Sequence, residues 1–113
     1  MKIGLDLDGT IYAYPEFFAE LMKAMAARGH RFYCTSSHGR SQWELEDVPR
    51  LRALGIDASL LSPELLYPLQ HGDIRLKGMA ADWCDIVFDD DANLAQHTKT
   101  PVMCPLARSG FLV

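Results

Sequence analysis

The strongest constraint on the fold of this chain is the alternation of short apolar runs with longer segments of helical periodicity. Apolar runs predict strands near residues 2–7, 31–35, 58–61, 85–88 and 101–104. Helices are predicted over 15–28, 42–54, 77–83 and 91–98, whereas 62–76 is expected to be irregular apart from a short helical turn. Strands that alternate with helices indicate a parallel sheet with helices on both faces. We therefore expect an α/β fold, a three-layer, doubly wound parallel sheet of about five strands.

Size and composition fit one domain over residues 1–113. The chain has 113 residues, of which 49% are hydrophobic and 23% are charged, and its formal net charge is −4. These values are ordinary for a folded domain, and a chain of this length supports one hydrophobic core.

The sequence also argues against several classes of protein. No apolar run approaches the roughly 18 residues of a membrane span, and Asp6 and Asp8 interrupt the N-terminal apolar stretch too early for a signal peptide. The acidic isoelectric point, near 5.4, argues against binding of nucleic acid. Cys34, Cys84 and Cys104 form neither a zinc-site nor a disulfide pattern. We expect reduced thiols, a cytoplasmic location and no membrane partner.

Polar side chains follow three of the predicted strands at the points where those strands end. Asp6 and Asp8 close the first strand, Thr35 and Ser36 the second, and the run 89–91, three aspartates, the fourth. Ligands of open parallel sheets bind beyond the carboxyl ends of the strands. We therefore expect these side chains to share one crevice.

The residue types in this crevice predict a site for phosphate and a divalent cation. Two carboxylates at positions 6 and 8 of a strand project to the same side. Beside the aspartates at 89–91 they concentrate negative charge, which is costly unless a cation offsets it. Mg²⁺ prefers such oxygen ligands and typically binds one or two carboxylates together with substrate phosphate. Gly9 allows the backbone to approach a ligand, and donors to phosphate oxygens would be Thr10, Thr35 and Lys77.

Four segments resemble, in the same order, the four motifs of the haloacid dehalogenase (HAD) superfamily of phosphotransferases. Residues 6–10, Asp-Leu-Asp-Gly-Thr, resemble its D-x-D-G-T signature after an apolar strand. Residues 33–35 (Tyr-Cys-Thr) resemble the second motif, Lys77 the third and 86–90 (Ile-Val-Phe-Asp-Asp) the fourth. The resemblance extends over nearly the whole chain, from residue 2 to about 103, and implies a Rossmann-like HAD core.

The resemblance implies covalent catalysis by two aspartates. Asp6 would be the nucleophile that attacks phosphorus and becomes an aspartyl phosphate. Asp8 would protonate the leaving oxygen and then deprotonate the water that hydrolyses the intermediate. Such duty requires one carboxyl that stays protonated beside an ionised one. The expected function is a Mg²⁺-dependent phosphomonoester hydrolase, a phosphatase acting through Asp6.

The resemblance also implies the metal ligands. Mg²⁺ would be held by the carboxylate of Asp6, the backbone carbonyl of Asp8 and the carboxylate of Asp90. Asp89 is expected as a further acidic contributor, and Asp91 as the cap of the following helix.

Phosphate contacts are expected from the loops around the same crevice. Thr35 would hydrogen-bond the transferring phosphoryl group, with Ser36 as the alternative because the register is ambiguous by one residue. Lys77 would offset charge on the nucleophile and on phosphate. Further candidates for phosphate or substrate contact are Gly9, Thr10, His38 and Arg40.

The segments in which HAD enzymes insert cap domains are short in this chain. Thr10 and Pro15 are almost adjacent, and the stretch between the third strand and Lys77 is too short for a cap of the second type. No cap domain is therefore expected. A large substrate would cover the site, or a second copy of the chain would do so in a homo-oligomer. The phosphorylated substrate could be a sugar phosphate, a nucleotide, a phosphoprotein or a nucleic-acid end, the last disfavoured by the charge.

Two other interpretations of the same residues stay open. A catalytically idle HAD-like domain would bind a metal or a partner protein without turnover, although an intact Asp8 weighs against it. A receiver-like signalling domain also combines an acidic pair, an acceptor aspartate, a threonine and a lysine. Receivers place the acidic pair first and the acceptor in mid-chain, an order that this chain does not follow.

Overall fold

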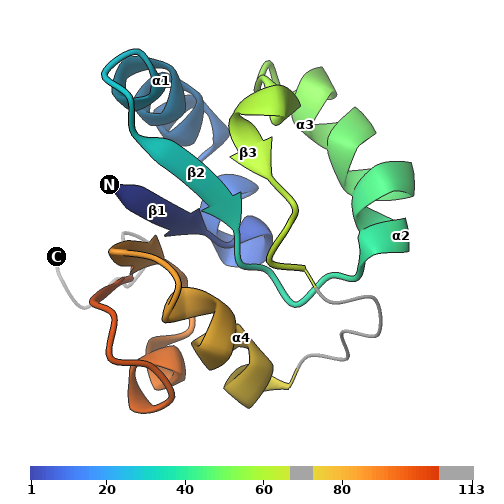
Figure 1. Ribbon diagram of the computed structural model, residues 1–113. Helices are drawn as coiled ribbons and strands as arrows, with labels where there is room; N and C mark the ends of the chain where they lie inside the picture. The colour runs from blue at the N-terminus through green and yellow to red at the C-terminus, as the bar shows by residue number, and fades with distance from the viewer. Residues whose placement is uncertain (67–72, 105–113) are drawn as a thin grey trace, which may run out of the picture.

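A computed structural model describes residues 1–66 and 73–104, and its strands form one five-stranded parallel sheet (Figure 1). The strands are β1 (Lys2–Leu5), β2 (Arg31–Cys34), β3 (Leu61–Ser62), β4 (Ile86–Phe88) and β5 (Val102–Met103). Their order across the sheet is β3-β2-β1-β4-β5, and every neighbouring pair is parallel. The predicted α/β fold with a parallel sheet is confirmed, and β1 lies at its centre.

Helices and helical turns connect the strands. A wide turn (Leu7–Ile11) leads from β1 to α1 (Pro15–Ala26). After β2 and a loop of residues 35–39, the chain forms one continuous helical stretch: α2 (Arg40–Gln42), a π-helical turn (Trp43–Asp47) and α3 (Val48–Ala53). The remaining elements are the 3-10 turn Ala58–Leu60 before β3, α4 (Ile74–Ala81) before β4, and the 3-10 turn Ala92–Gln96 before β5. No helix within residues 1–66 and 73–104 is long and apolar enough to cross a membrane.

The alternation of side chains along the strands buries two apolar clusters, one on each face of the sheet. The first cluster contains Ile3 and Leu5 of β1, Phe18 of α1 and Leu51 of α3. The second contains Val87 of β4 and Ala81 of α4. Helices therefore cover both faces, and Figure 1 shows α1 and α3 on one side of the sheet and α4 on the other.

Two glycines allow close packing of α4 and of the central strands. A β-carbon on Gly4 would lie 2.8 Å from Cγ2 of Val87 and 2.9 Å from Cγ2 of Thr35. A β-carbon on Gly78, within α4, would lie 2.2 Å from the backbone oxygen of His97. Side chains do not fit at such distances, so α4 lies directly against the segment that follows β4. This contact fixes the position of the residue before Gly78, which is Lys77.

Two predicted boundaries are wrong because aspartate side chains cap local turns. α4 begins at Ile74 rather than at residue 77, since the side chain of Asp73 accepts a hydrogen bond from the backbone N–H of Arg75. Asp57 accepts in the same way from Ser59, so 58–60 form a 3-10 turn. The third strand is therefore shorter than predicted, with only two residues.

The first strand, predicted over 2–7, ends at Leu5 because residues 7–11 form a turn, so Asp6 and Asp8 follow the strand rather than lie within it. The other elements lie close to their predicted positions. The segment after β4 is a 3-10 turn over Ala92–Gln96 rather than a helix over 91–98, and Asp91 caps it as expected by accepting from the backbone N–H of Asn93. The helical segment predicted from residue 42 begins at Arg40. Part of the stretch predicted to be irregular, 67–72, lies outside the described residues, as does 105–113, which the sequence did not place.

Candidate active site

The carboxyl ends of β1 and β4 bring Asp6 and Asp89 together. Leu5 pairs with Phe88, so the next residue of each strand leaves the sheet at the same level. The backbone N–H of Asp6 donates to the carbonyl of Phe88 over 3.0 Å. β2 lies on one side of β1 and β4 on the other, which makes this the switch point at which open parallel sheets bind ligands.

Three carboxylates gather at this point. One oxygen from each of Asp6, Asp89 and Asp90 lies within 4.8 Å of the others. Asp6 is 4% exposed and Asp89 is fully buried. Carboxylates this close raise one another's energy in the ionised form, and burial adds to that cost. The cluster therefore requires compensating positive charge or protons.

Lys77 supplies part of the positive charge. Its ammonium lies 2.8 Å from Oδ2 of Asp89 and 3.4 Å from Oδ1 of Asp6. Burial disfavours the charged form of Lys77, but the two carboxylates outweigh it and raise the pKa of Lys77. One ammonium does not balance three carboxylates. The remaining negative charge and the oxygen donors fit a hard divalent cation such as Mg²⁺.

Burial raises the pKa of Asp6 to about 7; Lys77 opposes this rise, whereas Asp89 and Asp90 add to it. Burial also raises the pKa of Asp89 against the influence of Lys77. A cation beside these groups would favour their ionised forms. Ionisation of the cluster and binding of a cation are therefore coupled.

Gly9 lets the turn after β1 pass directly beside Asp90. The residue has φ of +76°, and a β-carbon there would lie 2.1 Å from Oδ2 of Asp90. Glycine is favoured both by this backbone conformation and by the contact. The turn is closed by the backbone N–H of Tyr12, which donates to the carbonyl of Leu7 over 3.0 Å. The main chain of the Asp-Leu-Asp-Gly-Thr segment thus lies against the acidic cluster.

Two buried threonines lie at the same end of the sheet. Thr10, on the turn after β1, is fully buried, and Thr35, directly after β2, is 1% exposed. Neither hydroxyl oxygen has a hydrogen-bond partner within the described parts of the chain. A buried polar group without a partner costs about 1–3 kcal/mol, which a ligand oxygen would recover. The Ser36 hydroxyl instead accepts from the backbone N–H of His38 over 3.4 Å, which favours Thr35 as the phosphate contact.

Asp8 belongs to a second group of interacting side chains. Its side chain is 68% exposed, and its Oδ2 lies 2.7 Å from Nε2 of His38. Nδ1 of His38 lies 2.7 Å from Oδ2 of Asp47, and Oδ1 of Asp47 accepts from the Tyr12 hydroxyl over 2.5 Å. Burial lowers the pKa of His38, but hydrogen bonds with Asp47 and Asp8 outweigh it and raise that pKa. His38, predicted as a substrate contact, thus contacts the predicted general acid.

Asp47 and Tyr12 are not among the site residues predicted from the sequence. A signal for Asp47 exists: it lies four residues from Trp43 and from Leu51, both buried, so it interrupts the apolar stripe of an amphipathic helix. A carboxylate on an apolar face is buried and requires a partner. Tyr12 carries no comparable signal, since a tyrosine after a turn is equally consistent with packing.

The side chain of Arg40 hydrogen-bonds backbone carbonyls within the described parts of the chain. Its Nε donates to the carbonyl of Leu66 over 3.2 Å and its Nη2 to the carbonyl of Glu64 over 3.3 Å. These bonds tie α2 to the segment that follows β3. The contact of Arg40 with substrate stays a prediction.

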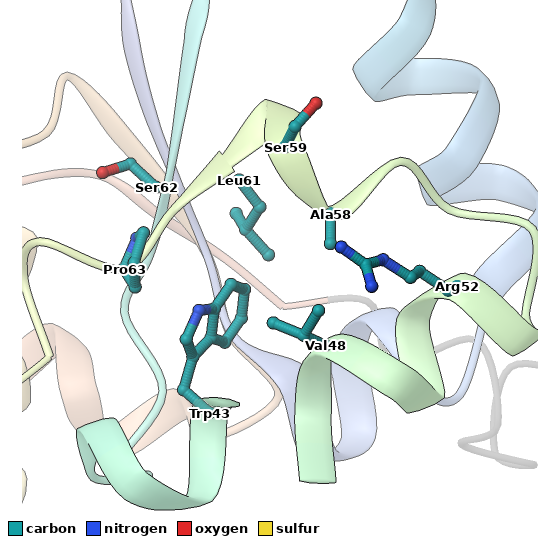
Figure 2. A pocket seen from close by; sticks show the side chains of 8 residues that line it. All are labelled: Trp43, Val48, Arg52, Ala58, Ser59, Leu61, Ser62 and Pro63. Atoms are coloured by element: carbon teal, nitrogen blue, oxygen red, sulfur yellow. The ribbon is translucent and has the colours of Figure 1, made fainter. Parts of the chain in front are cut away.

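A separate cavity of about 370 Å³ lies beside β3, and Figure 2 shows its lining. The indole of Trp43 and the side chains of Val48 and Leu61 form its apolar part, and Arg52 reaches it from α3. Among the described residues, none that lines it carries a carboxylate. The cavity is therefore distinct from the acidic cluster at the ends of β1 and β4.

Comparison with known proteins found no match to this chain. No family model matches the chain, and neither a curated protein nor a solved structure matches it.

Proposed function

We propose that this protein is a Mg²⁺-dependent phosphomonoester hydrolase with a capless HAD-like core, and that Asp6 is its nucleophile. The observation that carries the proposal is the contact of Lys77 with both Asp6 and Asp89 at the ends of β1 and β4. These residues come from three of the four sequence segments that resemble HAD motifs. Their juxtaposition is what a phosphoryl-transfer site requires: a nucleophile, a cation site and a fixed positive charge.

In the first step, an ionised oxygen of Asp6 attacks phosphorus. The bond between phosphorus and the leaving oxygen breaks as the Asp6–phosphorus bond forms, and Asp8 donates a proton to the leaving oxygen. The exposure of Asp8, against the burial of Asp6, supports this division, because an exposed acid is accessible to the leaving group of a substrate that binds from solvent. Lys77 and the Thr35 hydroxyl would stabilise the charge on the phosphoryl oxygens.

In the second step, water attacks the phosphorus of the aspartyl phosphate. Asp8, now ionised, accepts a proton from that water, and the bond between Asp6 and phosphorus breaks. Inorganic phosphate leaves, and both aspartates return to their initial protonation states. No oxidant or further reactant is required.

The donor set supports Mg²⁺ as the cofactor, since three carboxylates lie together and the ammonium of Lys77 contacts only two of them, Asp6 and Asp89. Asp6, the backbone carbonyl of Asp8 and Asp90 would hold the ion, with Asp89 beside them. When bound, Mg²⁺ supplies positive charge to phosphate oxygens and favours the ionised nucleophile.

The surroundings of the site support a capless enzyme in a reducing compartment. Only the turn Leu7–Ile11 and three further residues separate β1 and Asp6 from α1. A large substrate or a second copy of the chain would then exclude water from the reaction.

The cysteines Cys34 and Cys84 are buried free thiols, which supports a cytoplasmic location.

The experiment that tests the proposal is hydrolysis of p-nitrophenyl phosphate by the wild type, with Mg²⁺ and with EDTA. The matched variants are Asp6→Asn and Asp57→Asn. Asp57 is an exposed cap remote in sequence from every motif, and asparagine caps equally well. We expect Mg²⁺-dependent turnover in the wild type and in D57N, and none in D6N.

Other outcomes separate the alternatives. Turnover that survives D6N would contradict the proposed nucleophile. Mg²⁺ binding without turnover of this or any other phosphomonoester tested would favour an idle metal-binding domain.

A further inference from the structure

The two ring nitrogens of His38 each contact a carboxylate. Nε2 lies 2.7 Å from Oδ2 of Asp8, and Nδ1 lies 2.7 Å from Oδ2 of Asp47. A carboxyl oxygen that carries no proton only accepts hydrogen bonds, so both ring nitrogens donate when the proton of Asp8 is on Oδ1 rather than Oδ2. His38 thus bridges an exposed carboxylate and a buried one.

Asp47 is held from a second direction. Its other oxygen accepts the hydroxyl proton of Tyr12 over 2.5 Å. The guanidinium carbon of Arg50 lies 3.7 Å from the centre of the Tyr12 ring, which fixes that ring by a cation–π contact. Asp47 therefore has both oxygens occupied, and its orientation is set before any ligand binds.

Local helix geometry places Asp47 at this point. It is the last residue of the π-helical turn Trp43–Asp47, which the backbone N–H of Val48 closes onto the carbonyl of Trp43. Such wide turns are uncommon and are frequent at functional sites. Trp43 and Leu51 anchor the same helical stripe in the apolar cluster, so the carboxylate between them is directed inward.

We propose that His38 is a positioning residue for Asp8, held in place by Asp47 and Tyr12; this inference rests on the proposed phosphatase function. His38 anchors Oδ2 of Asp8 and leaves Oδ1 to exchange the proton with the leaving oxygen. The exposed carboxylate of Asp8 is thereby oriented in advance, so this rotational freedom does not have to be lost during the reaction. Asp47 prevents the imidazole from turning away, as the outer partner of a ligating or catalytic histidine does.

Two conservative variants of His38 separate the two contacts. The amide nitrogen of glutamine reaches about the position of Nε2, so His38→Gln keeps the donor to Asp8 and loses the contact with Asp47. The amide nitrogen of asparagine lies about at Nδ1, so His38→Asn keeps the contact with Asp47 and loses the donor to Asp8. If His38 served only packing, H38Q and H38N would lose activity to a similar extent, whichever contact each variant keeps.

The measurement is kcat and KM of the wild type, H38Q and H38N with two substrates, p-nitrophenyl phosphate and phenyl phosphate. We expect kcat of H38N to fall by about 10–100-fold with phenyl phosphate, whose leaving group needs the proton, because general acid catalysis contributes about 10²–10⁴-fold. With p-nitrophenyl phosphate the loss should be several times smaller. H38Q should retain most of kcat with both substrates, and KM should change little.

Contrary results are distinguishable. Equal losses in H38N and H38Q, or a loss that does not depend on the leaving group, would overturn the positioning role while leaving the phosphatase function intact. A wild type that hydrolyses neither substrate would overturn the proposed function, and this inference with it.

If H38N does not fold, Tyr12→Phe carries the test. It removes the hydroxyl that fixes Asp47 and keeps both contacts of His38. We expect a loss in kcat of about two- to fivefold that is larger with phenyl phosphate, since a misplaced catalytic group loses rate through geometry. An unchanged kcat with both substrates would contradict the role of the Asp47–Tyr12 pair.

Discussion

The carboxylate of Asp90 lies against the α-carbon of Gly9, so closely that a β-carbon on Gly9 would be 2.1 Å from Oδ2 of Asp90. This contact joins the first and the last of the four motif-like segments. The position of Asp90, a proposed cation ligand, therefore depends on the absence of a side chain at Gly9.

Gly9→Ala should therefore weaken Mg²⁺ binding. The variant introduces a side chain at positive φ, which costs about 1–2 kcal/mol, and it also displaces Asp90. Gly55→Ala is the matched control, because Gly55 also has positive φ but nothing lies within 4 Å of the added carbon. We expect both variants to lose stability and only G9A to lose Mg²⁺ affinity, by about tenfold, in a calorimetric titration. Equal Mg²⁺ affinities in G9A and G55A would contradict the inference that Gly9 holds Asp90 in position for the cation.

Asp90→Asn should raise the Mg²⁺ concentration required for activity by at least about tenfold, because an amide replaces a charged ligand. Asp91→Asn is the control: Asp91 caps the turn Ala92–Gln96, and asparagine caps as well as aspartate. The measurement is the hydrolysis rate as a function of Mg²⁺ concentration. Overlapping curves for D90N and the wild type would show that Asp90 is not a ligand.

Asp6→Asn should stabilise the metal-free protein at high pH. Burial raises the pKa of Asp6 from 3.8 to about 7, so between these values the folded protein holds a proton that the unfolded chain releases. The stability from Asp6 is therefore complete below pH 3.8 and is lost as pH rises through about 7. At pH 8 in EDTA, D6N should unfold at a temperature several degrees above that of the wild type, and the difference should shrink towards pH 4.

Mg²⁺ should reverse that order. Binding of the ion to the folded state stabilises the wild type by mass action and has less effect in D6N, which lacks one ligand. Thermal unfolding with saturating Mg²⁺ measures this. If the wild type is more stable than D6N at pH 8 in EDTA, the prediction that ionised Asp6 destabilises the metal-free protein is contradicted.

Asp8→Asn should slow turnover by about 10²–10⁴-fold and allow the phosphorylated Asp6 intermediate to accumulate, because asparagine cannot deprotonate the attacking water. The intermediate adds the mass of one phosphoryl group, which intact-mass measurement detects after incubation with p-nitrophenyl phosphate, an ester with a good leaving group. The double variant D6N/D8N should show no such addition. Phosphorylation of the double variant would place the acceptor elsewhere.

Much of the site was predictable because it depends on where strands end. Asp6, Thr35 and Asp89 each follow an apolar run directly, and a parallel sheet brings such positions to one edge. Lys77 was predicted as a phosphate donor from its residue type, with support from its order among the motifs, but one lysine near a helix start carries no spatial information. The structure places its ammonium at Asp89 because α4 packs closely through Gly78.

The sequence alone determined the alternation of strands and helices, the parallel sheet and the residues at the strand ends, because these follow from local patterns of apolar and polar side chains. Only the tertiary structure decided the environment of Asp8. His38, Asp47 and Tyr12 come from three separate segments, and although the apolar stripe around Asp47 indicates that this carboxylate is buried, it does not indicate its partners. A buried carboxylate selects its partners through desolvation and hydrogen bonding in the packed protein, and these act only after the segments have come together.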